Sequence, residues 1–234
     1  MRALRLLVLA CAFGALLGVA GPARAANECD GHMVCVPVAG PWVVVPAGSG
    51  LARPRVEFQL TCPRGWIVGG LDAELSHRAL DVTFVARLGS PVNPGISTSR
   101  SAVFVARYVG ETAQAPSFRP HVGCIPSAGG GSRIPTSVAA FQPGEPTVRR
   151  VRTVRVRPGT TTVVVACRAG ERLVGASHAF GFRRASPPGP SLARTVSGVR
   201  AARGNRVVVS ARGDAELGGV RAVVQVHALC ARVR

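Results

Sequence analysis

The sequence contains no lysine, so all 29 of its basic residues are arginines, and only 11 acidic residues balance them. The resulting net charge of +18 favours anionic partners. Aromatic residues make up only 5% of the 234 residues, too few for a base-stacking platform, so specific nucleic-acid recognition is not expected. There is no Gly-X-Y period and no sustained heptad, which excludes collagen and a long coiled coil.

Long apolar runs are absent after the N-terminus, so no segment of the mature chain is expected to cross a membrane. Near the N-terminus, two arginines precede the apolar residues 6–19, and Ala23-Arg24-Ala25 has the small-x-small pattern of a cleavage site. We therefore predict a signal peptide over residues 1–25 and a mature chain, of net charge +15, that is secreted or periplasmic. The apolar run is too short to favour an uncleaved anchor, and too little of it precedes Cys11 for a lipoprotein.

The mature chain keeps an even number of cysteines, which in an exported protein predicts three disulfides. The six residues are Cys29, Cys35, Cys62, Cys124, Cys167 and Cys230. Spacing alone leaves every pairing open, so the pairing has to be inferred from another pattern.

An internal repeat supplies that pattern. The segment from Cys62 to Gly69 is similar to the segment from Cys167 to Gly175, at an offset of about a hundred residues. His121-Val122-Gly123-Cys124 and His227-Ala228-Leu229-Cys230 are related by the same offset. Equivalent cysteines should pair equivalently. This predicts Cys62–Cys124 and Cys167–Cys230, with Cys29–Cys35 as a local loop.

Strand patterns dominate both copies. Apolar residues alternate with other residues in segments 56–62, 80–88 and 220–230, and no window shows a helical period. Turns are marked by Asn93-Pro94-Gly95, Pro143-Gly144 and Pro158-Gly159.

These patterns predict an all-β fold of two tandem antiparallel β-sandwiches or small barrels, each with one disulfide. The expected boundaries are 26–35 for the N-terminal disulfide loop, 36–145 for the first domain and 146–234 for the second. The alternative is one fused domain in which the two units pair across a pseudo-two-fold axis.

The motif Cys62-Pro63-x-Gly65-x-x-Val68-Gly69-Gly70, closed by a strand that ends in Cys124, resembles a module of exported bacterial proteins, mostly uncharacterised. The second copy keeps five of the motif positions but has Arg168 in place of the proline and Ala176 in place of the last glycine. The resemblance implies a secreted β-rich fold. It implies no activity, catalytic residue or cofactor.

Five arginines lie close together at the junction of the two copies, and their guanidinium forks suit phosphate, sulfate or carboxylate groups. They are Arg149, Arg150, Arg152, Arg155 and Arg157. We predict that they bind an anionic glycan, lipid or other envelope polymer; the alternative is a solvated edge that prevents aggregation. Their alternation slips near Thr153, which predicts a bulge or a break in the strand there.

Two chemical readings compete with a binding role. Gly175-Ala176-Ser177-His178-Ala179 differs by one residue from a nucleophile elbow, so an extracellular hydrolase using Ser177 or a histidine is the alternative function. The repeated His-x-x-Cys has zinc-ligand types, but residues three apart on a strand face opposite ways. We therefore predict disulfides with surface histidines, no metal, and a non-enzymatic binding or structural protein.

Overall fold

The structure, a computed structural model, describes residues 26–47, 53–85, 100–111, 115–127 and 147–233. Within these ranges the chain is almost entirely β, with one short helix and one 3-10 turn, and every strand pair of its sheets is antiparallel. The prediction of an all-β antiparallel fold is thus confirmed. The predicted signal peptide, the turns at Asn93-Pro94-Gly95 and Pro143-Gly144, and the boundary between residues 145 and 146 lie outside the described residues.

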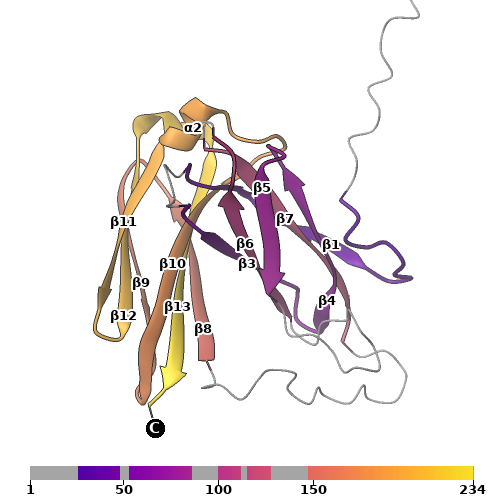
Figure 1. Ribbon diagram of the computed structural model, residues 1–234, viewed down its shortest axis with the longest axis horizontal. Coiled ribbons are helices and arrows are strands. Elements are labelled where there is room, and N and C mark those ends of the chain that lie inside the picture. Colours follow the sequence, from indigo (N-terminus) through magenta and orange to yellow (C-terminus); the bar gives the residue numbers. More distant parts are fainter. Residues whose placement is uncertain (1–25, 48–52, 86–99, 112–114, 128–146, 234) are drawn as a thin grey trace, which may run out of the picture.

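Seven strands form one continuous sheet. In spatial order along the sheet they are β1 (Val36–Ala39), β7 (Ser117–Pro126), β2 (Trp42–Val44), β10 (Glu171–Arg183), β13 (Arg221–Arg232) and β8 (Thr147–Val156), with β4 (Trp66–Leu75) pairing along β7. We call residues 26–127 the first half and residues 147–233 the second half. Figure 1 shows the two halves side by side, purple and magenta against orange and yellow.

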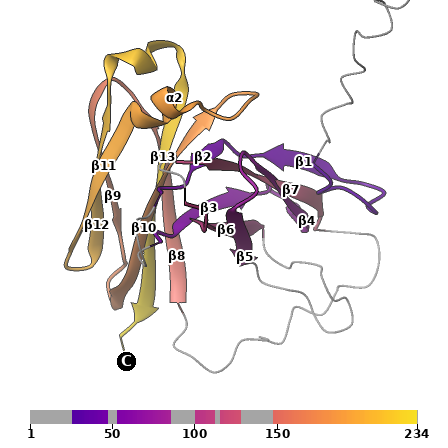
Figure 2. The same cartoon turned by 45° about the horizontal axis from the view of Figure 1, so that its top comes forward.

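A smaller layer faces this sheet in each half. In the first half it contains β3 (Val56–Thr61), β6 (Ser101–Tyr108) and β5 (Leu80–Val85). In the second half it contains β11 (Val196–Arg203) paired with β12 (Arg206–Gly213), and β9 (Gly159–Ala166) lies along β12. The remaining elements are the helix α2 (Pro190–Arg194) and the 3-10 turn η1 (Ala215–Gly219). Figure 2 shows the facing layers from a second direction.

Strand β2 joins the halves because it is hydrogen-bonded on both edges. Val43 is in register with Phe118 of β7 on one side and with Gly181 of β10 on the other. The core of the first half also takes in Ala179 of β10, while Val44 packs against the core of the second half. The sheet therefore runs without interruption from one half into the other.

The three predicted disulfides are present, in the predicted pairing. Cys29 is bonded to Cys35, Cys62 to Cys124, and Cys167 to Cys230. In each half the first cysteine of the long bridge follows a strand of the smaller layer directly, and the second lies in the closing strand of the large sheet. Each long bridge therefore ties two layers together across a buried core.

The Cys-x-x-Gly motif has the same backbone shape in both halves. Gly65 and Gly170 have positive φ angles of 81° and 77°, which side chains with a Cβ adopt reluctantly, and each directly precedes a strand of the large sheet or lies one residue from it. The register of β4 then shifts between Val68 and Gly70, and that of β10 shifts between Leu173 and Gly175. Both shifts are β-bulges at matching places in the motif.

The N-terminal disulfide loop covers the outer face of β4 and β7. The backbone carbonyl of Glu28 lies so close to Gly70 and Gly123 that a Cβ at either glycine would overlap it. At the matching bulge of the second half, a Cβ at Gly175 would lie 3.3 Å from the Cβ of Leu229, a much milder approach. The last glycine of the Val-Gly-Gly motif thus makes room for this loop.

Gly70→Ala is expected to detach the N-terminal loop, because the new methyl group would occupy the place of the Glu28 carbonyl. We expect a loss of about 1–3 kcal/mol, the usual cost of overpacking. Hydrogen exchange of residues 27–36 measures the detachment. Gly175→Ala is the matched control and should cost less than about 1 kcal/mol. Equal effects of the two variants would contradict this explanation of Gly70.

Candidate functional site

Residues from both halves meet at a polar cluster between β3 and the outer face of the large sheet. Ser177 on β10 and His227 on β13 are directly opposite each other in the strand register. Gln225 is two residues before His227 on the same face, and Arg149 comes from β8. Glu57 of β3 reaches into the group from the first half. We call these five residues the junction cluster.

Glu57 is an ionised carboxylate that accepts hydrogen bonds from both sides. One of its oxygens accepts from the Arg149 guanidinium and, at 2.9 Å, from the hydroxyl of Ser177. Burial raises the pKa of Glu57, but the hydrogen bond and charge of Arg149, together with the hydrogen bond from Ser177, outweigh burial and lower it. The ion pair is partly buried, with about a fifth of the Glu57 side chain exposed.

His227 is neutral and its tautomer follows from its neighbours. Its Nδ1 is 2.9 Å from Nη1 of Arg149, and its Nε2 is 2.7 Å from Oε1 of Gln225. Arginine can only donate, so Nδ1 accepts and the proton is on Nε2, which donates to Gln225. Burial and the nearby charge of Arg149 lower the pKa of His227 to about 4, against a smaller opposing effect of Glu57.

Gln225 links the cluster to the backbone of the first half. Its Oε1 accepts from the backbone N–H of Gln59 at 2.6 Å, and its Nε2 donates to the Gln59 carbonyl at 3.1 Å. The same amide nitrogen also donates to Oγ1 of Thr153 at 2.9 Å. The side-chain amide therefore pairs with β3 much as the peptide group of a neighbouring strand would.

The hydrogen bonds of the cluster do not assemble a hydrolytic site. A cavity of about 190 Å³ borders Ser177, His227 and Glu57. However, the Ser177 hydroxyl donates to Glu57, and the one acceptor nitrogen of His227 is engaged by Arg149. A carboxylate with a lowered pKa is also a weak base. Strand β10 continues through Ser177 to Arg183, so the strand-to-helix turn of a nucleophile elbow is not found at this serine.

The five arginines predicted as a binding patch divide into two groups. Arg149 belongs to the junction cluster, and Arg150 makes a bidentate ion pair with Glu171 at 2.6–3.1 Å. The hydrogen bond from Arg150 is the largest cause of the lowered pKa of Glu171. The other members, Arg152, Arg155 and Arg157, are exposed, and no hydrogen bond or ion pair joins their side chains to other described residues.

The bulge expected near Thr153 is not present, and that interpretation was wrong. Strand β8 pairs with β13 in one unbroken register from Thr147 to Val156. Arg152 is opposite Val226, which faces the core of the second half, whereas Arg155 is opposite Val223 on the outer face. The change of alternation therefore means that β8 carries arginines on both of its faces.

A row of arginines from three strands lies on the outer face beyond the junction cluster. Arg183 at the end of β10 is directly opposite Arg221 at the start of β13, and Arg155 is opposite Val223 on the far side of β13. All three arginines are exposed and make no ion pair with the residues that the structure describes. We call Arg155, Arg183 and Arg221 the arginine row. Sequence analysis missed two of its members because only the strand register brings them together.

The predicted surface histidines are buried instead. His121 is 5% exposed and His227 is 1% exposed. As strand alternation requires, each faces away from the cysteine three residues later, but the outer faces of the sheet are covered. His227 lies beneath β3, and His121 lies beneath the N-terminal loop, with its Nδ1 3.4 Å from Glu28 and its Nε2 2.8 Å from Glu74.

The described cysteines are not available as metal ligands. In the described ranges, one group of possible ligands has suitable spacing, namely Cys167, Glu171 and Cys230. Its two sulfur atoms are bonded to each other, so neither offers a thiolate. Glu171 is in turn held by Arg150.

No protein-family model matches the sequence, and a search of curated proteins also finds no match. Among the described residues, no helix has the length and apolar character needed to cross a membrane. The function has therefore to be argued from the geometry itself.

Proposed function

We propose that the chain is an exported, non-enzymatic protein that binds anionic polymers of the cell envelope or the extracellular space. We further propose that it consists of two copies of a disulfide-tied β-sandwich, fused through β2. The arginine row is the observation that carries the binding proposal. The three disulfides support export, because such bonds persist in oxidising compartments.

The arginine row places like charges side by side with no acidic partner among the described residues. Neighbouring strands are about 4.8 Å apart, so the Cα atoms of Arg183 and Arg221 are close, and Arg155 is displaced by only two positions along the neighbouring strand. Like charges in such positions repel one another. A chain of sulfate, phosphate or carboxylate groups would relieve the repulsion and accept bidentate hydrogen bonds from each guanidinium.

The rest of the molecule favours the same class of ligand. The net charge of +18 attracts any polyanion over a distance set by ionic strength. Base recognition is not supported, because aromatic residues are scarce. Phe118 and Phe182 are moreover fully buried, so their rings are not available for stacking.

Replacing Arg155, Arg183 and Arg221 by glutamine is expected to weaken binding to heparin, used here as a model anionic polymer. Each lost contact releases fewer counterions, so the slope of log K against log salt concentration should fall by about 2–3. Isothermal titration at several salt concentrations measures the slope.

The matched control replaces Arg78, Arg203 and Arg206, three other exposed arginines, by glutamine. This variant loses the same net charge, and its slope should change by less than about 1. If both variants lose affinity equally, binding follows net charge alone and the arginine row is not the site. If neither does, the proposed function is wrong.

A further inference from the structure

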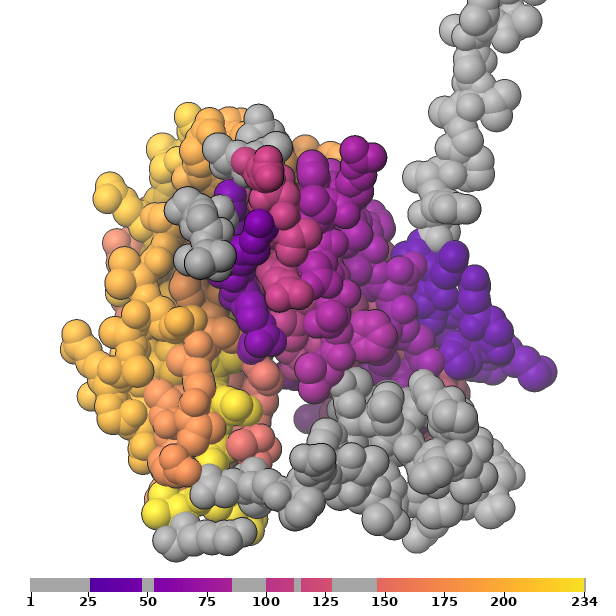
Figure 3. All heavy atoms as spheres, viewed as in Figure 1, coloured from indigo at the N-terminus to yellow at the C-terminus, as the bar shows by residue number. Residues whose placement is uncertain are grey.

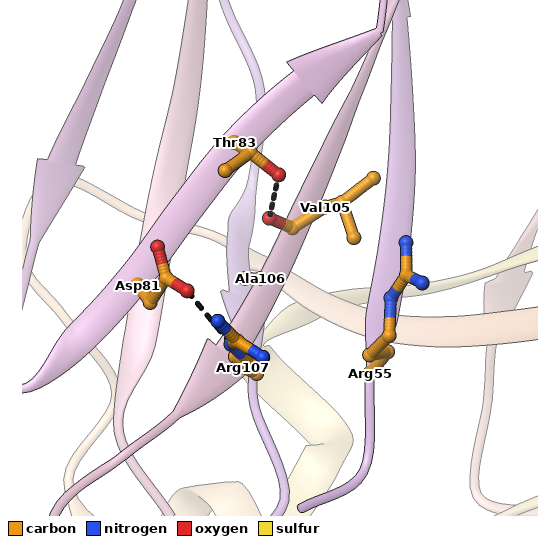
Figure 4. Close-up of a pocket in the computed structure, with 6 residues that line it drawn as sticks. All are labelled: Arg55, Asp81, Thr83, Val105, Ala106 and Arg107. Carbon is orange, nitrogen blue, oxygen red and sulfur yellow. Dashed lines mark hydrogen bonds and ion pairs between the residues drawn. The ribbon is translucent and has the colours of Figure 1, made fainter.

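A second group of arginines surrounds a hollow on the first half, on the outer face of the layer formed by β3, β6 and β5. Arg107 of β6 is directly opposite Asp81 of β5, and Arg55 directly precedes β3 on the other side of β6. The register of Val56 with Ala106 places Arg55 beside Arg107. Figure 4 shows these side chains around the backbone of Ala106, with Thr83 and Val105 completing the rim.

The two guanidiniums differ in what holds them. Nε of Arg107 donates to a carboxylate oxygen of Asp81 at 2.7 Å, which orients the fork and leaves its two terminal nitrogens without a recorded partner. Arg55 has no hydrogen bond or ion pair with any described residue. Two positive charges therefore share one carboxylate, and the row Arg55–Arg107–Asp81 has a net charge of +1.

The hollow has the size and lining of a small anion site. Its volume is about 220 Å³, below the range of pockets that hold drug-sized ligands but ample for a single oxyanion. Val105 at its rim is buried, while both arginines and Thr83 are exposed. The Thr83 hydroxyl is 3.5 Å from the carbonyl of Val105, a long contact that leaves it able to turn toward a ligand.

We propose that this hollow binds one tetrahedral oxyanion group, a phosphate or a sulfate, between the guanidiniums of Arg55 and Arg107. Arg107 is held ready by Asp81, and Arg55 closes over the group from β3. The three oxygens of such a group match two forks and a hydroxyl better than a carboxylate does, since a carboxylate has only two oxygens. The site lies on the other half from the arginine row, and it requires a single group and not a polymer.

Because the site is open, we expect a dissociation constant on the order of 1 mM for inorganic phosphate at low ionic strength. The ¹H–¹⁵N signals of the arginine side chains, followed during a phosphate titration, measure it directly. Saturable shifts are expected at Arg55 and Arg107. Sulfate should compete, and the ratio of the two affinities shows which anion the hollow prefers.

Arg55→Gln is expected to weaken phosphate binding about tenfold, the loss of one charge-assisted pair. Arg55→Lys keeps the charge but loses the fork, so it should bind several-fold more weakly than the wild type. Arg64→Gln is the control, because Arg64 is also exposed but lies in the turn after Cys62.

Absence of saturation, unchanged binding in Arg55→Gln, or equal losses in Arg55→Gln and Arg64→Gln would each overturn the proposal. The variant that lacks the arginine row should bind phosphate like the wild type. Loss of heparin binding there, with phosphate binding retained, separates this site from the proposed function.

Discussion

Acidification from about pH 7 to about pH 4 is expected to lower the free energy of unfolding by about 3 kcal/mol through His227 alone. The pKa of its imidazole is about 4 in the fold and 6.5 without the fold. Between these values the unfolded chain binds more protons than the folded chain, so stability rises with pH. The contribution is fully present above 6.5 and is lost as the pH falls toward 4.

The physical cause is the position of the ring. A protonated His227 would be a buried cation whose Nδ1 proton points at the guanidinium of Arg149, 2.9 Å away. Other groups act in the same direction. Burial lowers the pKa of His178, with a further effect of Arg200, and the pKa of Glu57 is lowered as well. The total loss of stability in acid should therefore exceed that of His227.

Urea unfolding of the wild type and of His227→Gln over this pH range separates the contributions. The variant should be less stable near neutral pH, since Arg149 and Gln225 lose a partner, but its stability should depend less steeply on pH. An NMR titration of the His227 ring is the direct measurement. A ring that titrates near its ordinary value, or equal slopes for both proteins, would contradict the geometry of the junction cluster.

Replacing both cysteines of a long disulfide by alanine is expected to cost about 4 kcal/mol, the largest effect of any change considered. The bridges Cys62–Cys124 and Cys167–Cys230 close loops with sequence separations of 62 and 63 residues. In the chain-entropy model, opening loops of this length restores most of the freedom of the unfolded half. Since single domains are stable by only about 5–15 kcal/mol, such a variant is close to unfolding.

The short bridge provides the control for this measurement. Cys29–Cys35 spans a sequence separation of 6, so its removal should cost only about 2 kcal/mol. The effect should be confined to the N-terminal loop. Denaturant unfolding of both double variants gives the two values under identical conditions. A long-bridge variant that loses no more stability than the short-bridge variant would refute the entropic argument.

Local patterns were enough to predict the elements and their covalent ties. The alternation in segments 56–62 and 220–230 became β3 and β13, and the repeated Cys motif led to all three disulfide pairs. These features succeed because a strand face and a disulfide position each depend on residues that are close in sequence or repeated in it.

The junction cluster was not predictable in the same way. Glu57 and Gln59 look like ordinary outward-facing residues of β3, and Gln225 gives no signal on its own. Their roles arise because β3 covers the outer face of β10 and β13, a contact between segments more than a hundred residues apart. The burial of His227 has the same origin, which is why a surface position was expected for it.

The arginines show how pairing changes the meaning of a charge run. Arg149 and Arg150 are neutralised by Glu57 and Glu171, acids that are distant from them in sequence. Arg183 and Arg221 are likewise distant from Arg155, yet they share one face with it. A count of charges along the chain could suggest a basic surface, but only the register shows which arginines remain free of acidic partners.

Because Val43 and its neighbours in β2 are bonded to a strand on each side, neither half can be excised cleanly. A fragment that begins after residue 146 would expose the edge of β10 and leave Gln225 without the peptide group of Gln59. Such an edge recruits foreign strands, so the isolated C-terminal piece is a candidate for aggregation. The molecule is thus expected to melt as one cooperative unit, despite the resemblance between its parts.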